Sequence, residues 1–187
     1  IRDENGKPQV WESCQTFSGS WGYHRDESTW KSVPMLIQML IDHVSKGGNL
    51  LLNVGPTARG EFDERALARL RGIGEWMKRH ERSIYGCGAA PEGLTPPPDC
   101  RYTCNAKTGR LYVHFFAWPF GTANLPGMAG KVKYAQLLND ASEIRCTQPA
   151  ADPHSAGQSR GSEGDLVLQL PTVKPNAEVP VVELFLK

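Results

Sequence analysis

Two short segments near the start of the 187-residue chain carry side chains that could do chemistry. The first is Trp11-Glu12-Ser13-Cys14, within a β-compatible run from Val10 to Thr16. Glu12 could be a catalytic carboxylate at the end of a strand, and Cys14 could be a nucleophile. The structural alternative is that Cys14 is a small buried hydrophobe and that Glu12 only makes supporting hydrogen bonds. The residue types alone leave both interpretations open.

The second segment, residues 18–26, reads S-G-S-W-G-Y-H-R-D and places Ser, His and Asp close together. We do not expect a hydrolase triad, because a nucleophile elbow needs G-x-S-x-G before a helix, and Ser18 stands at the first glycine position. Triad partners also meet in space and not along the chain. Gly19 and Gly22 instead flank Trp21 in a loop that can present the indole for stacking on an apolar sugar face. The alternative is that Trp21 is a core residue, since Trp is mostly buried in proteins.

A third segment, residues 47–56, reads G-G-N-L-L-L-N-V-G-P. It lacks the G-K-[ST] ending of a phosphate loop and opens no helix, so a nucleotide-binding α/β protein is disfavoured. An apolar run without alternation suits a parallel strand buried on both faces. Asn53 would then lie near the carboxyl end of a strand, where barrel enzymes hold their active sites. The equal alternative is that Asn53 only fixes the backbone of the loop.

The elements that must position these side chains alternate between strand and helix. Ser32 fits an N-cap, Pro34 the first turn, and a basic last turn followed by Gly47 ends the helix. Its apolar stripe comprises Val33, Leu36, Ile37, Leu40 and Val44. Asp63 caps a second helix with an apolar face of Leu67, Leu70, Ile73 and Met77. The βαβα order predicts a parallel sheet, and because two strands leave open edges, we expect more βα units before Ile1.

The second half of the chain has a different pattern. Only three of the 14 prolines precede residue 88, where G-C-G-A-A-P and a run of three prolines indicate a domain boundary. Short strands are predicted over residues 111–116, 132–138, 166–170 and 181–186. Such strands between Gly/Pro turns favour an antiparallel β-sandwich. Residues 149–164 have almost nothing to bury and are predicted to form a mobile surface loop.

The composition of the chain argues against several other classes of protein. With 21 Lys+Arg against 20 Asp+Glu, the chain lacks the basic excess of a nucleic-acid binder, and no apolar run is long enough to span a membrane. Cys100 and Cys104 would lie about 13 Å apart in an extended strand, too far for a disulfide. His80, His114 and His154 show no ligand spacing. We therefore expect no nucleic-acid or membrane partner, no metal and no cofactor.

In chain order, W-E-x-C, S-W-G-Y, K-G-G-N-L-L-L-N-V-G-P, G-E-W-M and S-I-Y-G resemble the α-L-fucosidase family of retaining glycoside hydrolases. The match covers about residues 10–87 and is most specific over residues 45–56. Residues 110–119, R-L-Y-V-H-F-F-A-W-P, are similar to a strand of that family's C-terminal β-sandwich. The resemblance implies an α/β plus all-β fold. Residues 1–87 would be the last βα units of a (β/α)8-like catalytic barrel, and residues 88–187 the sandwich domain.

The resemblance also implies an activity, the exo-hydrolysis of terminal α-L-fucose from glycoconjugates with retention, through a covalent fucosyl-aspartate. The family's aspartate nucleophile and acid/base carboxylate both lie before W-E-x-C, so we expect them upstream of Ile1 and expect the isolated chain to be inactive. Trp21 matches the aromatic residue that walls the fucose pocket. Cys14 matches a position flagged in the family signature, but retaining glycosidases use two carboxylates about 5–5.5 Å apart. Glu12, in the same motif, is expected to have a supporting role.

The expected partners are a fucosylated oligosaccharide or glycoconjugate and the upstream part of the same polypeptide. Members of such a family are secreted, periplasmic or lysosomal more often than cytoplasmic. The alternative hypothesis is a non-catalytic module, in which the sandwich binds carbohydrate or only packs against a partial α/β domain. The barrel-like motifs favour the enzyme, because a free sugar-binding module would not need them. We accordingly expect residues 88–187 alone to bind no glycan.

Overall fold

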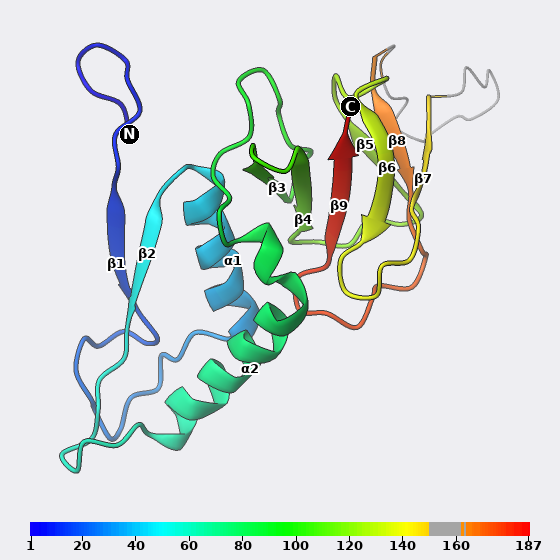
Figure 1. Ribbon diagram of the computed structural model, residues 1–187. Helices are drawn as coiled ribbons and strands as arrows, with labels where there is room; N and C mark the ends of the chain where they lie inside the picture. The colour runs from blue at the N-terminus through cyan, green and yellow to red at the C-terminus, as the bar shows by residue number, and fades with distance from the viewer. Residues whose placement is uncertain (150–161, 163) are drawn as a thin grey trace.

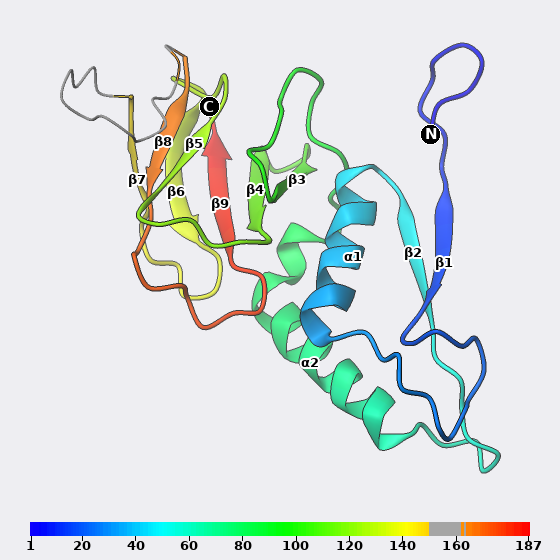
Figure 2. The same ribbon diagram turned by 180° about the vertical axis from the view of Figure 1, so that it is seen from behind.

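The computed structural model describes residues 1–149, 162 and 164–187. Most of the loop predicted over residues 149–164 lies outside the described residues. Two helices stand between a pair of strands on the N-terminal side and two sheets on the C-terminal side (Figure 1, and from behind in Figure 2). The N-terminal elements are β1 (Glu12–Thr16), α1 (Val33–Ser45), β2 (Asn49–Asn53), α2 (Glu64–His80) and the 3₁₀ turn η1 (Glu81–Ser83).

β1 and β2 pair in parallel, as the strand–helix order predicts, with Thr16 opposite Asn53 at their carboxyl ends. The expectation that β2 is buried on both faces is wrong for the described residues. Leu51 is 51% exposed, whereas its neighbours Leu50 and Leu52 are half-buried. The reason is that α1 contacts β2, while no described element covers the face that carries Leu51.

The glycine pair before β2 has a packing reason. A side chain at Gly48 would come within 2.2 Å of the Trp11 indole, and Gly47 has a left-handed φ of +72°. Gly47 adopts the left-handed conformation without strain because it has no side chain. Gly48, for the same reason, allows the Trp11 indole to lie on the backbone. In the G-G-N sequence the first glycine therefore ends α1, the second packs against Trp11, and β2 begins at the asparagine.

α1 begins at its predicted cap, where the Ser32 hydroxyl accepts from the Met35 amide at 3.3 Å. The predicted stripe is confirmed at Leu36, Ile37 and Val44, which are buried with Ile41, but Leu40 is only half-buried. Asp63 caps α2 by accepting from the Arg65 amide at 2.7 Å. No described helix is long and apolar enough to cross a membrane.

The predicted apolar face of α2 is shifted in the structure. Its buried residues are Ala66, Trp76 and His80, whereas Leu70 from the predicted face is 36% exposed. The physical reason is that the Trp76 indole N–H donates to the Val179 carbonyl at 2.8 Å, so the C-terminal half of α2 packs on the sandwich. A periodicity analysis of α2 alone does not contain that second contact.

The C-terminal half forms two antiparallel sheets, as predicted. One sheet has the order β3 (Cys100–Asn105), β4 (Arg110–Phe115), β9 (Val181–Leu186) and β6 (Val132–Leu137). The other has the order β5 (Thr122–Leu125), β8 (Leu166–Gln169) and β7 (Arg145–Thr147). Large apolar side chains from both sheets, such as Leu111, Leu168 and Leu184, form one core between them.

A second core joins the helices to the outer face of the four-stranded sheet. It brings together Ile37 and Ile41 of α1, Trp76 of α2, and Tyr112 and Val181 of the sheet. The four-stranded sheet is therefore buried on both faces, which explains why β9 shows no alternation of polar and apolar residues. The two halves share this core, and the domain boundary near residue 88 stays a prediction.

The burial pattern of α1 predicts unequal losses at two adjacent positions. Ile41 is fully buried, so Ile41→Ala should lower the free energy of unfolding by about 2–5 kcal/mol. Leu40→Ala should cost less, because Leu40 is only half-buried. Met35→Ala, at a 54% exposed position of the same helix, should stay within about 0.5 kcal/mol. Equal losses at positions 40 and 41, measured by urea titration, would contradict the packing described here.

Two buried histidines predict acid sensitivity. Burial, and then the neighbouring His80, lower the pKa of His114 from 6.5 to about 3, and burial lowers the pKa of His80 as well. Both rings are thus neutral in the folded chain and ionise more readily when it unfolds. The contribution of His114 to stability is fully present above pH 6.5 and is lost as pH falls toward about 3, by about 1.4 kcal/mol per pH unit. His80 changes stability in the same direction.

Denaturant titrations between pH 7 and pH 4.5 test this above the range where most carboxylates titrate. His114→Gln should flatten the dependence of stability on pH, because the glutamine side chain does not titrate. Its amide can still bond to Thr103, whose Oγ1 lies 2.8 Å from His114 Nε2. His24→Gln, at an exposed position, should leave the slope unchanged. An unaltered slope in His114→Gln would assign the acid sensitivity to other groups.

Candidate functional site

The loop that follows β1 lies at the carboxyl end of both parallel strands and closes on itself at its neck. The Lys31 amide donates to the Phe17 carbonyl at 2.9 Å. The Lys31 ammonium donates to the carbonyls of Thr16 and Ser18 at 2.7 and 3.0 Å. These bonds satisfy the carbonyl groups at the end of β1 and hold residues 17–31 as one compact unit, which we call the Trp21 loop.

Glu27 is the centre of hydrogen bonding inside the Trp21 loop. Its carboxylate accepts from the Ser20 hydroxyl at 2.7 Å and from the Thr29 amide and hydroxyl at 2.7 and 2.6 Å. These donors, Thr29 before Ser20, lower the pKa of Glu27 to about 2, because each bond favours the ionised form. Glu27 is therefore an anchored anion at neutral pH, with its oxygens occupied by the loop's own donors, and not a proton donor.

The first two turns of α2 clamp the Trp21 loop from the side. The guanidinium groups of Arg65 and Arg69 each lie 5.1 Å from the centre of the Trp30 ring. Arg65 also donates to the Glu27 carbonyl at 3.0 Å, and Arg69 to the Lys31 carbonyl at 2.8 Å. The position of the loop consequently depends on the position of α2.

The segment that leaves β2 docks against the same loop. Asn53 donates from its side-chain amide to the Trp21 carbonyl at 2.6 Å. A side chain at Gly55 would come within 2.4 Å of the Tyr23 amide nitrogen and 2.5 Å of the Gly22 carbonyl carbon. The N-V-G-P sequence thus fixes the backbone of the Trp21 loop, which is the second of the two alternatives for Asn53.

The outcome of this anchoring is an exposed indole on a fixed backbone. Trp21 is 60% exposed and Tyr23 is 40% exposed, although Trp is usually buried over most of its surface. Between Tyr23 and Asn53 the loop leaves a small depression that Glu27 and Trp30 also line. Such a surface can bind the apolar face of a ligand, but the loop contains no pair of free carboxylates that could catalyse glycoside hydrolysis.

The two other predicted site residues lie elsewhere. Glu12 is the first residue of β1, at the end opposite the Trp21 loop, and Cys14 is an exposed residue in the middle of the strand. Four residues of extended chain, about 13 Å, separate Glu12 from Thr16 at the loop end. The structure does not bring Glu12 and Cys14 together with Trp21, and their roles stay predictions.

The other reactive side chains are accounted for by packing. Burial raises the pKa of Cys87 to about 11 and that of Cys100 to about 12, so neither is a thiolate at neutral pH. Asp26 pairs with Arg25, and His24 makes no hydrogen bond to a serine among the described contacts, so no triad forms. No group of three potential metal ligands occurs among the described residues.

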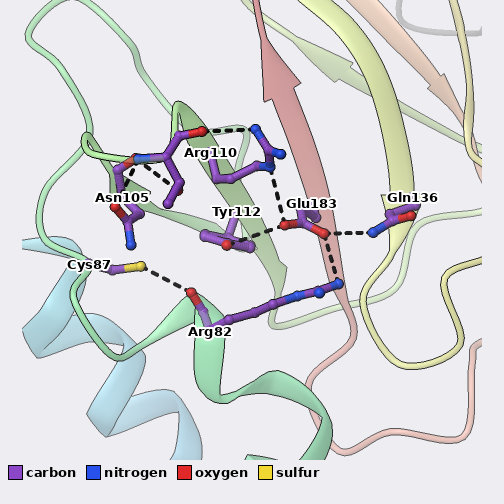
Figure 3. A network of polar contacts seen from close by, with 8 residues as sticks. Arg82, Cys87, Asn105, Arg110, Tyr112, Gln136 and Glu183 are labelled. Atoms are coloured by element: carbon purple, nitrogen blue, oxygen red, sulfur yellow. Dashed lines mark hydrogen bonds and ion pairs between the residues drawn. The ribbon is translucent and has the colours of Figure 1, made fainter.

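A second carboxylate network lies where η1 meets the sandwich (Figure 3). Glu183, whose side chain is 4% exposed, accepts from Arg82 at 2.9 Å and from Gln136 at 2.7 Å through one oxygen. The other oxygen accepts from Tyr112 at 3.3 Å and lies 3.6 Å from Arg110. Both oxygens are engaged and the side chain is shielded, so this cluster joins the helices to the sheet and is not a site for a substrate.

The exposure of Trp21 was predicted from the residue pattern, whereas Glu27 was not predicted to have a role. The local signal is weak, because the short-range bonding of a side chain to a nearby amide is typical of Ser, Thr, Asn and Asp and not of Glu. The donors Ser20 and Thr29 lie seven and two residues away, so that signal becomes specific only once the loop is closed.

With this geometry in place, comparisons with known proteins identify the class. A profile of the family described as Alpha-L-fucosidase matches residues 2–82. Human plasma alpha-L-fucosidase is 37% identical over 116 residues, 60% of this chain and 25% of that protein. The chain spans about a quarter of the length of the plasma alpha-L-fucosidases that it matches.

Solved structures extend the similarity over the whole chain. Alpha-L-fucosidase isoenzyme 1 from Paenibacillus thiaminolyticus is 37% identical with a TM-score of 0.88, over 100% of this chain and 42% of that one. The Thermotoga maritima alpha-fucosidase in complex with fucose is 26% identical with a TM-score of 0.76, over 94% and 40%. These matches define a glycoside hydrolase class. Within it, the chain belongs to the α-L-fucosidase family, as its motifs predict.

The bonding of Glu27 predicts that one charge orders the Trp21 loop. Glu27→Gln should speed amide hydrogen exchange at Gly19 and Thr29 about tenfold at pH 7. The Thr29 amide and hydroxyl lose a charged acceptor, and the Gly19 amide donates to that same hydroxyl at 3.0 Å. Asp26→Asn is the matched control: among the described contacts the Asp26 carboxylate pairs only with the exposed Arg25, so exchange should not change. In the parent, the folded pKa of about 2 lies below the ordinary 4.5, so order present above pH 4.5 is lost as pH falls toward 2.

Proposed function

We propose that this sequence is the C-terminal portion of an exo-acting α-L-fucosidase that removes terminal α-L-fucose from glycoconjugates. The observation that carries the proposal is the Trp21 loop, which lies within the part of the chain that matches the family and presents an indole at the carboxyl end of two parallel strands. Barrel enzymes assemble their sites at that end of the strands.

We further propose that β1 and β2 are the last strands of a (β/α)8-like barrel. Parallel sheets occur almost only where both faces are covered, whereas the face of β2 that carries Leu51 is open within the described residues. Upstream βα units of the same polypeptide would supply the covering strands. They would also supply the nucleophile and the acid/base, for which Glu12 and Cys14 are not suitably placed.

The proposed mechanism is retaining. A carboxylate attacks the anomeric carbon while a second carboxyl protonates the departing oxygen, and water then hydrolyses the fucosyl-enzyme. A trapped covalent intermediate with a fluoro-fucosyl compound is described for the Bacteroides thetaiotaomicron relative, which is 26% identical to this chain. That likeness supports, for this chain, a covalent fucosyl-aspartate formed by an upstream aspartate.

In this proposal Trp21 is a substrate-binding residue. Fucose is a 6-deoxy sugar, so its methyl group needs an apolar contact in place of a hydrogen bond. An indole that is 60% exposed on a backbone fixed by Asn53 can offer that contact without rearranging. The Trp21 loop thus supplies one wall of the sugar subsite, and Glu27 positions that wall without touching the sugar.

The test is kinetic and uses the full-length polypeptide that carries this sequence. It should hydrolyse an aryl α-L-fucoside and release α-L-fucose first, as followed by proton NMR. Trp21→Ala should lower kcat/KM about 10- to 200-fold, the range for losing one apolar contact in a pocket. Trp21→Phe should recover part of the loss, and Tyr85→Ala, at another exposed aromatic residue, should have no effect.

Three results would contradict the proposal. Initial release of the β-anomer would exclude retention. A large fall in melting temperature in Trp21→Ala without a kinetic defect would make Trp21 a packing residue. Turnover of the fucoside by the 187-residue chain alone would place the catalytic carboxylates within it and return Glu12 to a catalytic role.

A further inference from the structure

The sandwich contains a cavity of about 510 Å³ that shares no residue with the Trp21 loop. Its floor includes the buried ring of Phe115, at the end of β4, and its two walls are the turn before β3 and the connection from β4 to β5. This volume is in the range of pockets that bind small molecules. The cavity has no part in the function proposed above.

The first wall is a turn with an unexpected residue in it. The Cys100 amide donates to the Pro97 carbonyl at 3.1 Å, and Asp99 has a left-handed φ of +56°. Pro98 followed by a left-handed residue is the arrangement of a type II turn, in which glycine is the preferred third residue. Asp99 stands where glycine would be less strained, and its carboxylate has no hydrogen-bond or ion-pair partner among the described contacts.

The second wall is rigid and aromatic. The Trp118 indole N–H donates to the Pro171 carbonyl at 3.0 Å, and the Trp118 ring packs edge-on against Phe115 at 5.2 Å. The Leu170 amide donates to the Gly121 carbonyl at 2.8 Å. Between these two anchors Phe120 is 84% exposed at the rim.

The chemistry of the lining selects a class of ligand. Among the described residues that line the cavity, Asp99 is the only charged one, so phosphates and carboxylates would be repelled. A carboxylate accepts hydrogen bonds from paired hydroxyl groups, Thr122 adds a hydroxyl at the rim, and the rings of Trp118 and Phe120 offer apolar faces. Hydroxyl groups around a ring with an apolar face are the features of a neutral pyranose.

We propose that this cavity is a second, non-catalytic binding site for a neutral sugar ring, with Asp99 as the hydroxyl acceptor and Phe120 as the stacking surface. The choice of a glycan ring as the natural ligand rests on the proposed function, because a fucosidase meets its substrate as part of a larger glycan. The site would hold a neighbouring sugar while the barrel site processes fucose. The expectation from sequence that residues 88–187 alone bind no glycan stays a prediction, and the titration below decides between it and this proposal.

The experiment titrates methyl β-D-galactopyranoside and methyl α-L-fucopyranoside into the 187-residue chain by NMR. All proteins carry Trp21→Ala, so that binding at the Trp21 loop is not counted. We expect saturable shifts at amides of residues 97–100 and 118–122 with at least one sugar. Phe120→Ala should raise Kd about tenfold, whereas Val173→Ala, at an 80% exposed apolar position outside the lining, should leave Kd unchanged.

Asp99→Gly separates binding from folding. Glycine relieves the left-handed strain, so the melting temperature should stay the same or rise, while Kd should increase about tenfold. Lack of saturation with both sugars, or a Kd in Phe120→Ala and in Asp99→Gly that equals the Kd of the parent, would overturn the inference. Preferential binding of tetramethylammonium would also overturn it, and would make the cavity a cation cage.

The two proposals fail in different experiments. Sugar binding in the Trp21→Ala background, combined with no fucoside hydrolysis by the full-length polypeptide, would refute the proposed function alone. Hydrolysis combined with no sugar binding in that background would refute the second site alone.

Discussion

The arrangement of the whole chain depends on the contact that Trp76 makes with the sandwich. Its indole donates to the Val179 carbonyl at 2.8 Å and stacks on His80 at 4.8 Å, inside the core that the helices share with the four-stranded sheet. Arg65 and Arg69 lie within the preceding eleven residues of α2, about 16 Å or less along the helix axis. The contact that fixes α2 on the sandwich therefore also sets where these arginines clamp the Trp21 loop. A backbone carbonyl in the second half of the molecule thus contributes to the geometry of a site in the first.

Three carboxylates show how the surroundings of a group, and not its type, decide what it does. Glu183 is buried and bonded through both oxygens, so it joins elements and cannot meet a ligand. Glu27 is half-buried and is satisfied by donors of its own loop, so it positions that loop. Asp99 sits on a strained turn with no described partner for its side chain, so its interactions remain available to a ligand. In the sequence the three are equivalent acidic residues.

The sequence pattern predicted the parts of the fold that depend on interactions between neighbouring residues. The caps Ser32 and Asp63 and most of the α1 stripe are confirmed, because each depends on residues within a few turns. β7 was not predicted, since all three of its residues are exposed on a sheet edge and carry no apolar signal. The buried face of α2 was misjudged because Trp76 packs on Val179, 103 residues away. Long-range contacts of that kind leave no period in the sequence.

The candidate site also has one part that the sequence predicts and one part that it does not. The exposure of Trp21 could be predicted, because Gly19 and Gly22 around an aromatic residue are a local pattern. The function of Asn53 and Gly55 could not, because both act on the backbone of a loop more than thirty positions earlier. The N-V-G-P sequence that most resembles a family signature is therefore explained by packing: an amide that binds the Trp21 carbonyl, and a glycine without which the Gly22–Tyr23 backbone could not approach. A motif of this kind fixes the position of an exposed aromatic residue, and under the proposed function the residues that break the bond lie in another part of the polypeptide.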